Sequence, residues 1–293
     1  GNNHAIWSGS AVVDELNALG KQKGNVKTLF ALYTATHASK EKKAKFFQGA
    51  AYSTDKGRTW TKINDGKVVI PHQEGYAGGQ RDPRIFYYPQ REYYVTIMMV
   101  GGKDRAVRLW KSKDLLNWEI LGDIPNKAAE CIDMYTVAVD GDKDNMKWVI
   151  ADAGTRYEVG DFDGKKWVGY GDKDKNGKRF QFDFGDAYYA AQTFNQGPDK
   201  RVVHVGWLRS KQQGYRPFLD AEMPFTQQMS IPAEITLKTT SDGIRMYRNP
   251  VKEIKKLYTK SAKFGAKLSN AEYPICSASH EECNVFLQIS RFT

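Results

Sequence analysis

The chain has 293 residues, of which 41% are hydrophobic and 13% aromatic, so it can bury a large core and does not have the composition of a disordered protein. Its apolar runs fall short of the roughly 20 residues that a membrane-spanning helix needs, so we expect no membrane span. The formal net charge of +10 would suit nucleic acid, but the lysines are mixed with acids in turn-like segments such as residues 40–45. With no nucleic-acid motif beside them, we expect no nucleic-acid partner.

The three cysteines are too few for a disulfide framework, and none has the company of zinc ligands. Cys276 and Cys283 could form a bridge in an oxidising compartment, whereas Cys131 lies far from both in the sequence. The five histidines show no ligand spacing, so we expect no catalytic zinc.

In chain order, four apolar runs predict buried strands that begin roughly 50 to 65 residues apart. These runs are residues 28–33, 93–100, 147–151 and 201–208. A second β-prone run with a polar head precedes each of them. Those runs are residues 7–13, the segment after Arg81-Asp82, the segment after Glu130, and residues 186–194. The pattern indicates a repeated unit of several strands.

Three of the units also carry an Asp that precedes a Trp by a few residues. The pairs are Asp55 with Trp60, Asp114 with Trp118, and Asp161 to Asp163 with Trp167. An Asp that closes a turn on its own backbone, followed by an aromatic residue on the returning strand, is typical of a hairpin. Independent hairpins that merely look alike are the alternative interpretation.

A repeat of this length with about four strands per unit predicts an all-β fold of the propeller type, with four blades recognisable. Strands continue through residues 229–238 and 242–247, and only residues 14–19 and 251–257 suit a turn or two of helix. We therefore expect a propeller domain over residues 1–258 and the start of a second β-module, a sandwich, over residues 259–293. The polar heads of the first strands would then converge near the propeller axis.

At the start of two of these β-prone runs lie carboxylates that could take part in acid catalysis. Glu130 precedes the apolar residues Cys131, Ile132 and Met134, and such neighbours are expected to desolvate its carboxyl group and raise its pKa, which suits a general acid. Asp82 lies beside Arg81, which would keep it ionised. The alternatives are an exposed glutamate at a strand edge and a structural Arg81–Asp82 ion pair.

A further acidic segment resembles a calcium loop. Its candidate ligands are Asp172, Asp174, Asn176 and Asp183, with Gly177 at the position of the sharp turn. Asn176-Gly177 is also a favoured hairpin turn, and we prefer this interpretation, so we expect no metal and no other cofactor.

With these residues in hand, the chain resembles glycoside hydrolase family 32, the invertases, levanases and inulinases that act on β-fructosides. The resemblance runs through most of residues 5–258 and rests on the order and spacing of six motifs. They are residues 7–12, 52–60, 81–83, 130–131, 189–194 and 206–207.

The resemblance implies a five-bladed propeller followed by a β-sandwich, and a retaining glycosidase. It implies that Glu130 is the acid/base and that Asp82 stabilises the transition state and binds fructose hydroxyls. Four further residues would lie at the fructosyl pocket: Arg81, Ser8, Trp7 and Trp207. The expected partner is a fructose-containing oligo- or polysaccharide, and the expected location is extracellular or periplasmic.

The chain departs from the family pattern at its start. The family's nucleophile is an Asp in a Trp-Met-Asn-Asp-Pro-Asn-Gly type motif on the first blade, and no such motif precedes Trp7. We therefore expect the first blade to be largely absent and this polypeptide alone to have little or no hydrolytic activity. A fructan-binding protein without catalysis and a fructosyltransferase are the alternatives, and levan, inulin and sucrose are not distinguished.

Overall fold

The computed structural model describes most of the chain up to residue 257. The described residues are 4–37, 45–66, 68–76, 79–101, 105–127, 130–194, 197, 199–209, 222, 225 and 227–257. The chain divides into two units, residues 1–252 and residues 253–293, and the fold below is that of the first. The predicted sandwich module and the Cys276–Cys283 pair lie outside the described residues.

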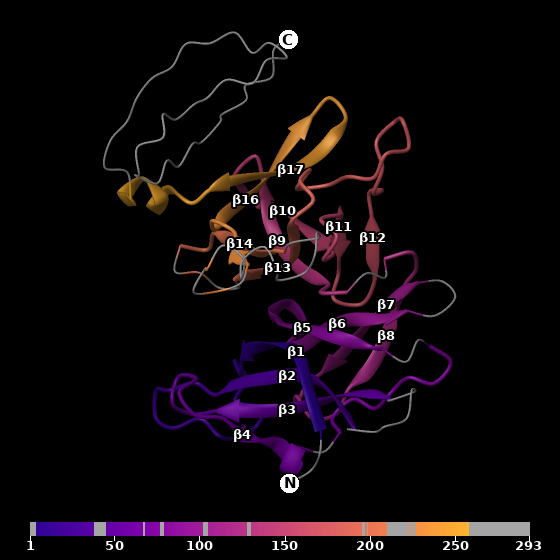
Figure 1. The fold of residues 1–293 in the computed structure, drawn as a ribbon. Coiled ribbons are helices and arrows are strands. Elements are labelled where there is room, and N and C mark those ends of the chain that lie inside the picture. Colours follow the sequence, from indigo (N-terminus) through magenta and orange to yellow (C-terminus); the bar gives the residue numbers. More distant parts are fainter. Residues whose placement is uncertain are drawn as a thin grey trace. The chain divides into compact units, whose positions relative to one another are not determined.

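Two four-stranded antiparallel sheets form the first half of the chain (Figure 1). One contains β1 (His4–Val13), β2 (Leu29–His37), β3 (Phe46–Ser53) and β4 (Thr61–Lys62), followed by the short 3-10 helix η1 (Ile63–Gly66). The other contains β5 (Arg81–Tyr88), β6 (Tyr93–Gly101), β7 (Ala106–Ser112) and β8 (Glu119–Ile124), with η2 (Pro89–Arg91) between its first two strands. Each sheet follows chain order, as expected for a propeller blade.

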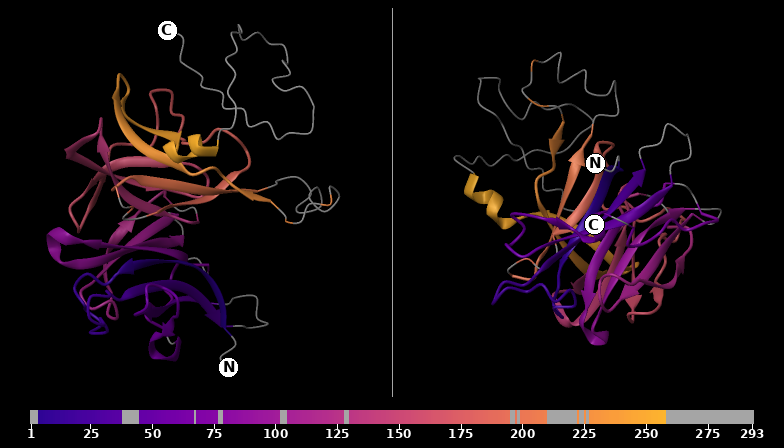
Figure 2. Two further views of the ribbon diagram at one scale, coloured as in Figure 1. Left: turned by 90° about the vertical axis from the view of Figure 1, so that its left-hand side faces the viewer. Right: turned by 90° about the horizontal axis from the view of Figure 1, so that it is seen from below.

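The second half of the chain forms one nine-stranded sheet. Its strands are β9 (Asp133–Val139), β10 (Asp142–Ala151), β11 (Tyr157–Phe162), β12 (Trp167–Gly169), β13 (Tyr188–Phe194), β14 (Val202–Leu208), β15 (Gln228–Met229), β16 (Ala233–Thr240) and β17 (Gly243–Pro250). The 3-10 helix η3 (Lys252–Leu257) follows. Figure 2 shows the same sheets from two further sides, each with twisted strands.

The nine-stranded sheet joins two units that we predicted to be separate. The first runs in the order β9 to β12, and the second contains β13, β14, β16 and β17. A short parallel pairing of β9 with β16 connects them, with Val139 opposite Leu237. The Asp140 side chain reinforces the joint, because its carboxylate accepts hydrogen bonds from the backbone N–H and the hydroxyl of Thr239 at 3.0 and 2.6 Å.

The cores lie between the sheets because neighbouring residues on a strand face opposite sides. On β5, Ile85 packs with Phe30 and Trp110 in one buried cluster, whereas the next residue, Phe86, packs with Met134 in another. The sheet β5–β8 is therefore covered on both faces. This stacking of twisted antiparallel sheets confirms the predicted β-propeller class.

The predicted hairpin turns are present. The Asp55 carboxylate accepts hydrogen bonds from the backbone N–H and hydroxyl of Thr59, and Asp114 accepts from the N–H groups of Leu116 and Asn117. Asp163 acts in the same way on the two residues that follow Gly164. Of the two segments expected to hold a turn or two of helix, residues 252–257 form a 3-10 helix, whereas residues 14–19 form non-helical turns. In the described part of the chain, no helix has the length and apolar character needed to cross a membrane.

Candidate active site

The backbone is irregular near the start of β1, β5 and β13, which are the first strands of their units. Strand pairing shifts register between Ile6 and Gly9 on β1, and a shift of the same kind interrupts β5 after Arg81 and β13 after Tyr189. Within or just before these heads, non-glycine residues adopt left-handed backbone angles. They are Asp82 (φ 62°), Cys131 (φ 53°) and Ala190 (φ 50°). Such bulges redirect side chains, and strained backbone of this kind clusters at functional sites.

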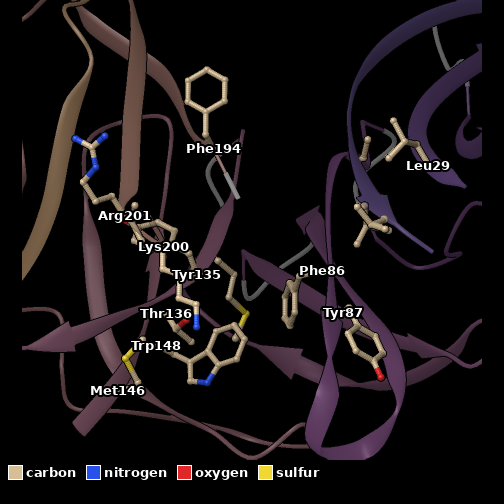
Figure 3. A pocket seen from close by; sticks show the side chains of 15 residues that line it. Leu29, Phe86, Tyr87, Tyr135, Thr136, Met146, Trp148, Phe194, Lys200 and Arg201 are labelled. Carbon is tan, nitrogen blue, oxygen red and sulfur yellow. The ribbon is translucent and has the colours of Figure 1, made fainter. Parts of the chain in front are cut away.

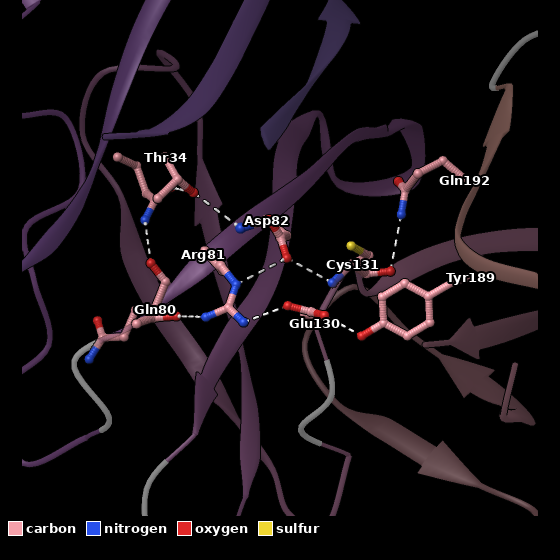
Figure 4. A network of polar contacts seen from close by, with 10 residues as sticks. Thr34, Gln80, Arg81, Asp82, Glu130, Cys131, Tyr189 and Gln192 are labelled. Carbon is pink, nitrogen blue, oxygen red and sulfur yellow. Dashed lines mark hydrogen bonds and ion pairs between the residues drawn. The ribbon is translucent and has the colours of Figure 1, made fainter. Parts of the chain in front are cut away.

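Arg81, Asp82 and Glu130 meet at one place, as the sequence predicted (Figure 4). Nη2 of Arg81 lies 2.6 Å from Oε2 of Glu130, and Nε of Arg81 lies 3.7 Å from Oδ2 of Asp82. The Glu130 side chain is 32% exposed and the Arg81 side chain 24%, so the pair is open to solvent. Asp82 is buried beneath them.

The backbone around Asp82 is fixed by polar contacts from three elements. The Asp82 N–H donates to Oγ1 of Thr34 on β2 at 3.1 Å, and the Cys131 N–H donates to Oδ2 of Asp82 at 2.8 Å. Ser10 on β1 accepts a hydrogen bond from the Ile85 N–H and donates to the carbonyl of Pro83. These bonds hold the segment that carries Arg81 and Asp82 against β1 and β2.

The electrostatic environment of Glu130 differs from the prediction. Its apolar neighbours were expected to raise the pKa, but Ile132 and Met134 point into buried packing and are each 1% exposed. The hydrogen bond from Arg81 instead lowers the pKa of Glu130, and a hydrogen bond from the Tyr189 hydroxyl acts in the same direction. The expected upward shift is therefore wrong, and Glu130 is a carboxylate near neutral pH in the ligand-free site.

The pKa of Asp82 is shifted in the opposite direction. Burial raises the pKa of Asp82, whereas the hydrogen bond from the Cys131 N–H and the charge of Arg81 oppose that rise. The two carboxyl groups therefore have environments that shift their pKa values apart. These directions are the reverse of those that the predicted roles need, since the acid/base residue must carry a proton and the stabiliser a negative charge.

Of the two aromatic residues predicted at the pocket, Trp207 is connected to this network through Tyr189. Trp207 on β14 stands edge-on to Tyr189, with ring centroids 6.5 Å apart, and Tyr189 bonds to Glu130. Trp7 on β1 is 50% exposed and its ring lies 5.2 Å from that of Phe46. Ser8 is exposed on β1, and its predicted role stays a prediction.

Sequence reasoning missed several residues of the network. Tyr189 and Gln192 belong to a motif that the resemblance used, yet neither was assigned a role. The Tyr189 hydroxyl donates to Oε1 of Glu130, and Nε2 of Gln192 donates to the Cys131 carbonyl at 3.0 Å. The apolar-rich run around them gave no sign that these two side chains contact Glu130 and Cys131, since the register shift of β13 lies between them.

The residues of the predicted calcium loop are used in other ways. Asp174 closes a hairpin turn by accepting from the N–H groups of Asn176 and Lys178. Asp172 faces Lys127 and Arg179 at 3.5 and 3.8 Å, and Asp183 accepts from Arg248 at 3.1 Å. Among the described residues, no group of three or more His, Cys, Asp or Glu side chains could hold a metal ion.

We expect calcium to leave the thermal stability of the protein unchanged, because Asp172 and Asp183 already face cationic side chains. A specific site would raise the melting temperature with ligand concentration. Thermal unfolding with millimolar calcium and with chelator measures this difference. A melting temperature that rises with calcium and falls back with chelator would show that this segment does bind calcium.

A cavity of about 450 Å³ lies at the other ends of the first strands (Figure 3). Its lining includes Val13, Phe86, Trp148 and Phe194, with Lys200 as a polar contributor. Among the described residues that line it there is no carboxylate, and Arg81, Asp82 and Glu130 are not among them. The cavity therefore lacks the groups that acid catalysis needs, and the functional assignment rests on the Arg81–Glu130 network.

Comparison with known proteins identifies the family of the chain. The sequence profile of the Glycosyl hydrolases family 32 N-terminal domain matches residues 1–250. The chain belongs to glycosyl hydrolase family 32. The match covers both carboxylates of the network and every strand of the three sheets.

This chain matches only part of the length of each family 32 relative. A levanase of Bacillus subtilis (strain 168) is 33% identical over 88% of this chain, which corresponds to 38% of the levanase. An extracellular exo-inulinase of Aspergillus niger is 27% identical over 83% of this chain and 50% of its own length. The crystal structure of exo-inulinase from Aspergillus awamori matches with a TM-score of 0.70 at 26% identity, covering 85% of this chain and 53% of that chain. The chain thus spans about half or less of the length of these relatives.

Proposed function

We propose that this protein is a β-fructosidase, a glycoside hydrolase acting on fructans or sucrose with retention of configuration. The observation that carries the proposal is the meeting of Arg81 and Asp82, at the bulged start of β5, with Glu130, which precedes β9 and is far from them in the sequence. Relatives named levanase and exo-inulinase support fructans as the substrate class.

In the proposed mechanism Glu130 donates a proton to the leaving oxygen and later activates water, which is the acid/base role in a retaining glycosidase. Glu130 is ionised in the ligand-free site, so it must take up a proton before the first step. Displacement of Arg81 from Oε2 by a bound sugar hydroxyl would remove the main cause of its low pKa.

Asp82 would bind fructose hydroxyls and balance the positive charge that develops at C2 in the transition state. Its carboxylate is pre-oriented by the Cys131 N–H and by the left-handed backbone at Asp82 itself. Retaining hydrolysis also requires a carboxylate nucleophile about 5 to 5.5 Å from the acid. The resemblance assigns that role to an Asp of another motif rather than to Asp82.

We also propose that the protein acts outside the cell, which the name of the extracellular exo-inulinase relatives supports. An intracellular location in a fractionation experiment on the source organism would contradict this part.

The test measures binding and turnover together. We expect the protein to bind levan or inulin oligosaccharides in calorimetry, and Asp82→Asn to weaken binding by about 10- to 100-fold, since hydrogen bonds to a charged group contribute about 1.5–3 kcal/mol. Asp144→Asn is the matched control, because Asp144 is exposed on β10. Fructose release from sucrose, inulin and levan is measured in parallel.

Three other outcomes change the assignment. Absence of both binding and fructose release would contradict it. Binding by the whole protein without release would favour the fructan-binding alternative. Transfer of the fructosyl group to sugar rather than water would favour the fructosyltransferase.

A further inference from the structure

The segment that leads into β5 contacts the guanidinium of Arg81. The described residues of this segment are 71–76 and 79–80. Nη1 of Arg81 donates to the Gly79 carbonyl at 2.7 Å, whereas Nη2 donates to Glu130 (Figure 4). The approach is close, since a methyl group on Gly79 would lie 2.8 Å from Nη1. The position of Gly79 therefore affects the orientation in which the Arg81 guanidinium meets Glu130.

Gln80 connects this end of the segment to its middle. Gln80 is 2% exposed, and its Oε1 accepts a hydrogen bond from the Gln73 N–H at 2.8 Å. Its Nε2 donates to the Gln73 carbonyl at 2.6 Å. Both bonds go to backbone groups of one residue, so one side-chain amide uses its donor and its acceptor to fix Gln73. A displacement of Gln73 is therefore transmitted to the residues next to Arg81.

Arg108 on β7 holds the middle of the segment. Nη1 of Arg108 donates to Oε1 of Gln73 at 2.9 Å, and Nη2 donates to the Tyr76 hydroxyl. The guanidinium carbon lies 4.4 Å from the centroid of the Tyr76 ring, within the range of a cation–π contact. Asp123 on β8 accepts from Nε and Nη2 of Arg108 at 2.5 and 2.9 Å, which fixes the guanidinium itself. Arg108 is 9% exposed, so these contacts are shielded from water.

We propose that Arg108 is a positioning residue for Arg81, and that it acts through the segment before β5. The connection runs through Gln73, Gln80 and Gly79, each joined to the next by a hydrogen bond or a peptide bond. A binding side chain that is held in one geometry in advance loses less conformational freedom when the ligand arrives. The inference rests on the proposed function, which has Arg81 at the fructosyl pocket.

The contacts of Arg108 exceed what the sheet itself requires. Arg108 and Asp123 are opposite residues of β7 and β8, so their pair alone could join these two strands. The bonds to Gln73 and Tyr76 are made to a different segment and contribute nothing to that strand pairing. They are explained if the guanidinium serves to hold the segment before β5 in place.

The experiment follows the nitrogen-15 NMR signals of the Arg81 side chain, assigned by their loss in Arg81→Lys. In the wild type, the contacts of Arg81 with Gly79 and Glu130 should slow rotation of its guanidinium and give separate Nη1 and Nη2 signals. We expect these signals to merge in Arg108→Met and in Arg108→Lys, because a single ammonium group cannot replace the three-way contact of a guanidinium. The affinity for levan or inulin oligosaccharides in calorimetry should fall by about 2- to 30-fold.

Three further variants make the result specific. Gly79→Ala should displace the Arg81 guanidinium directly, because the added methyl group would overlap with it. Gln73→Met removes one link and leaves the other contacts of Arg108 intact, so it should also merge the Arg81 signals and serves if Arg108→Met does not fold. Gln22→Met is the matched control, since the Gln22 amide, like that of Gln73, donates to a carbonyl two residues away. Its Arg81 signals should equal those of the wild type.

Separate Arg81 signals in a folded Arg108→Met or Gln73→Met variant would overturn the inference, and so would a single averaged signal in the wild type. A lower urea midpoint without a change in these signals would show that Arg108 only joins β7 to β8. The signals need no substrate, so the proposed function is tested separately. Merged signals in a protein that binds no fructan would retain Arg108 as a positioning residue and reject the β-fructosidase. Fructan binding with unchanged signals would do the reverse.

Discussion

In a polypeptide that also supplies the family's carboxylate nucleophile, replacing Glu130 by Gln is expected to slow fructose release from levan or inulin by about 10²–10⁴-fold, the usual contribution of a general acid. Gln keeps the size of the side chain and one oxygen for Arg81, so binding of the oligosaccharide should stay within about tenfold of the wild type. The loss should therefore fall on kcat rather than on KM. Steady-state kinetics with both fructans measures the two parameters.

Glu119→Gln is the control for this substitution. Glu119 begins β8, its side chain is 76% exposed, and it pairs only with Lys111 among the described residues, at 3.1 Å. Its kinetics should match those of the wild type. A Glu130→Gln variant that releases fructose at the wild-type rate would show that another group protonates the leaving oxygen.

The strands could be predicted from the sequence where apolar residues run together. The run at residues 93–100 became β6 (Tyr93–Gly101), and the run at residues 201–208 became β14 (Val202–Leu208). Strands with a buried charge were harder to predict. β7 holds Arg108 only 9% exposed, because its guanidinium pairs with Asp123 at 2.5 Å, and a sequence pattern does not reveal such a partner.

The site could be predicted as a set of residues but not as an electrostatic environment. Arg81 and Asp82 were placed beside Glu130 because all three head β-prone runs in a repeated unit. The pKa of Glu130 was misjudged because the side chains next to it in the sequence turn into the core. Its real neighbours, Arg81 and Tyr189, come from other strands through bulges that have no sequence signature.

The pairing of β9 with β16 could likewise not be predicted from the repeat pattern. Repeats predict strands that pair within a unit, whereas Val139 and Leu237 pair across two units. Beside this contact, Asp140 accepts two hydrogen bonds from Thr239, a partner that lies 99 residues away in the sequence.

A buried ion pair beneath the site connects three of the first strands. Asp133 on β9 is 1% exposed, and its Oδ1 lies 2.8 Å from Nε of Arg84 on β5. Arg84 also donates to the carbonyl and the hydroxyl of Thr193 on β13, both at 2.9 Å, and the Thr193 N–H donates to Oδ2 of Asp133 at 2.7 Å. Arg84, Asp133 and Thr193 each belong to a different blade unit.

Asp133→Ala is expected to lower the free energy of unfolding by about 3–5 kcal/mol, because it removes the carboxylate that balances the buried Arg84 charge. The midpoint of urea unfolding measures the loss, provided that the slope stays that of the wild type. Asp161→Ala is the control: its pair with Lys147 is at the surface, with the Asp161 side chain 55% exposed, and should contribute about 0–1 kcal/mol.

The double variant Arg84→Met with Asp133→Leu distinguishes the cost of removing one member of the ion pair from the cost of losing the ion pair itself. Replacing both charges by apolar side chains of similar volume removes the desolvated cation, so most of the stability lost in Asp133→Ala should return. The Thr193 N–H would still lack its acceptor, which limits the recovery. A double variant less stable than Asp133→Ala would mean that the pair itself, and not the avoidance of a lone buried charge, holds β5, β9 and β13 together.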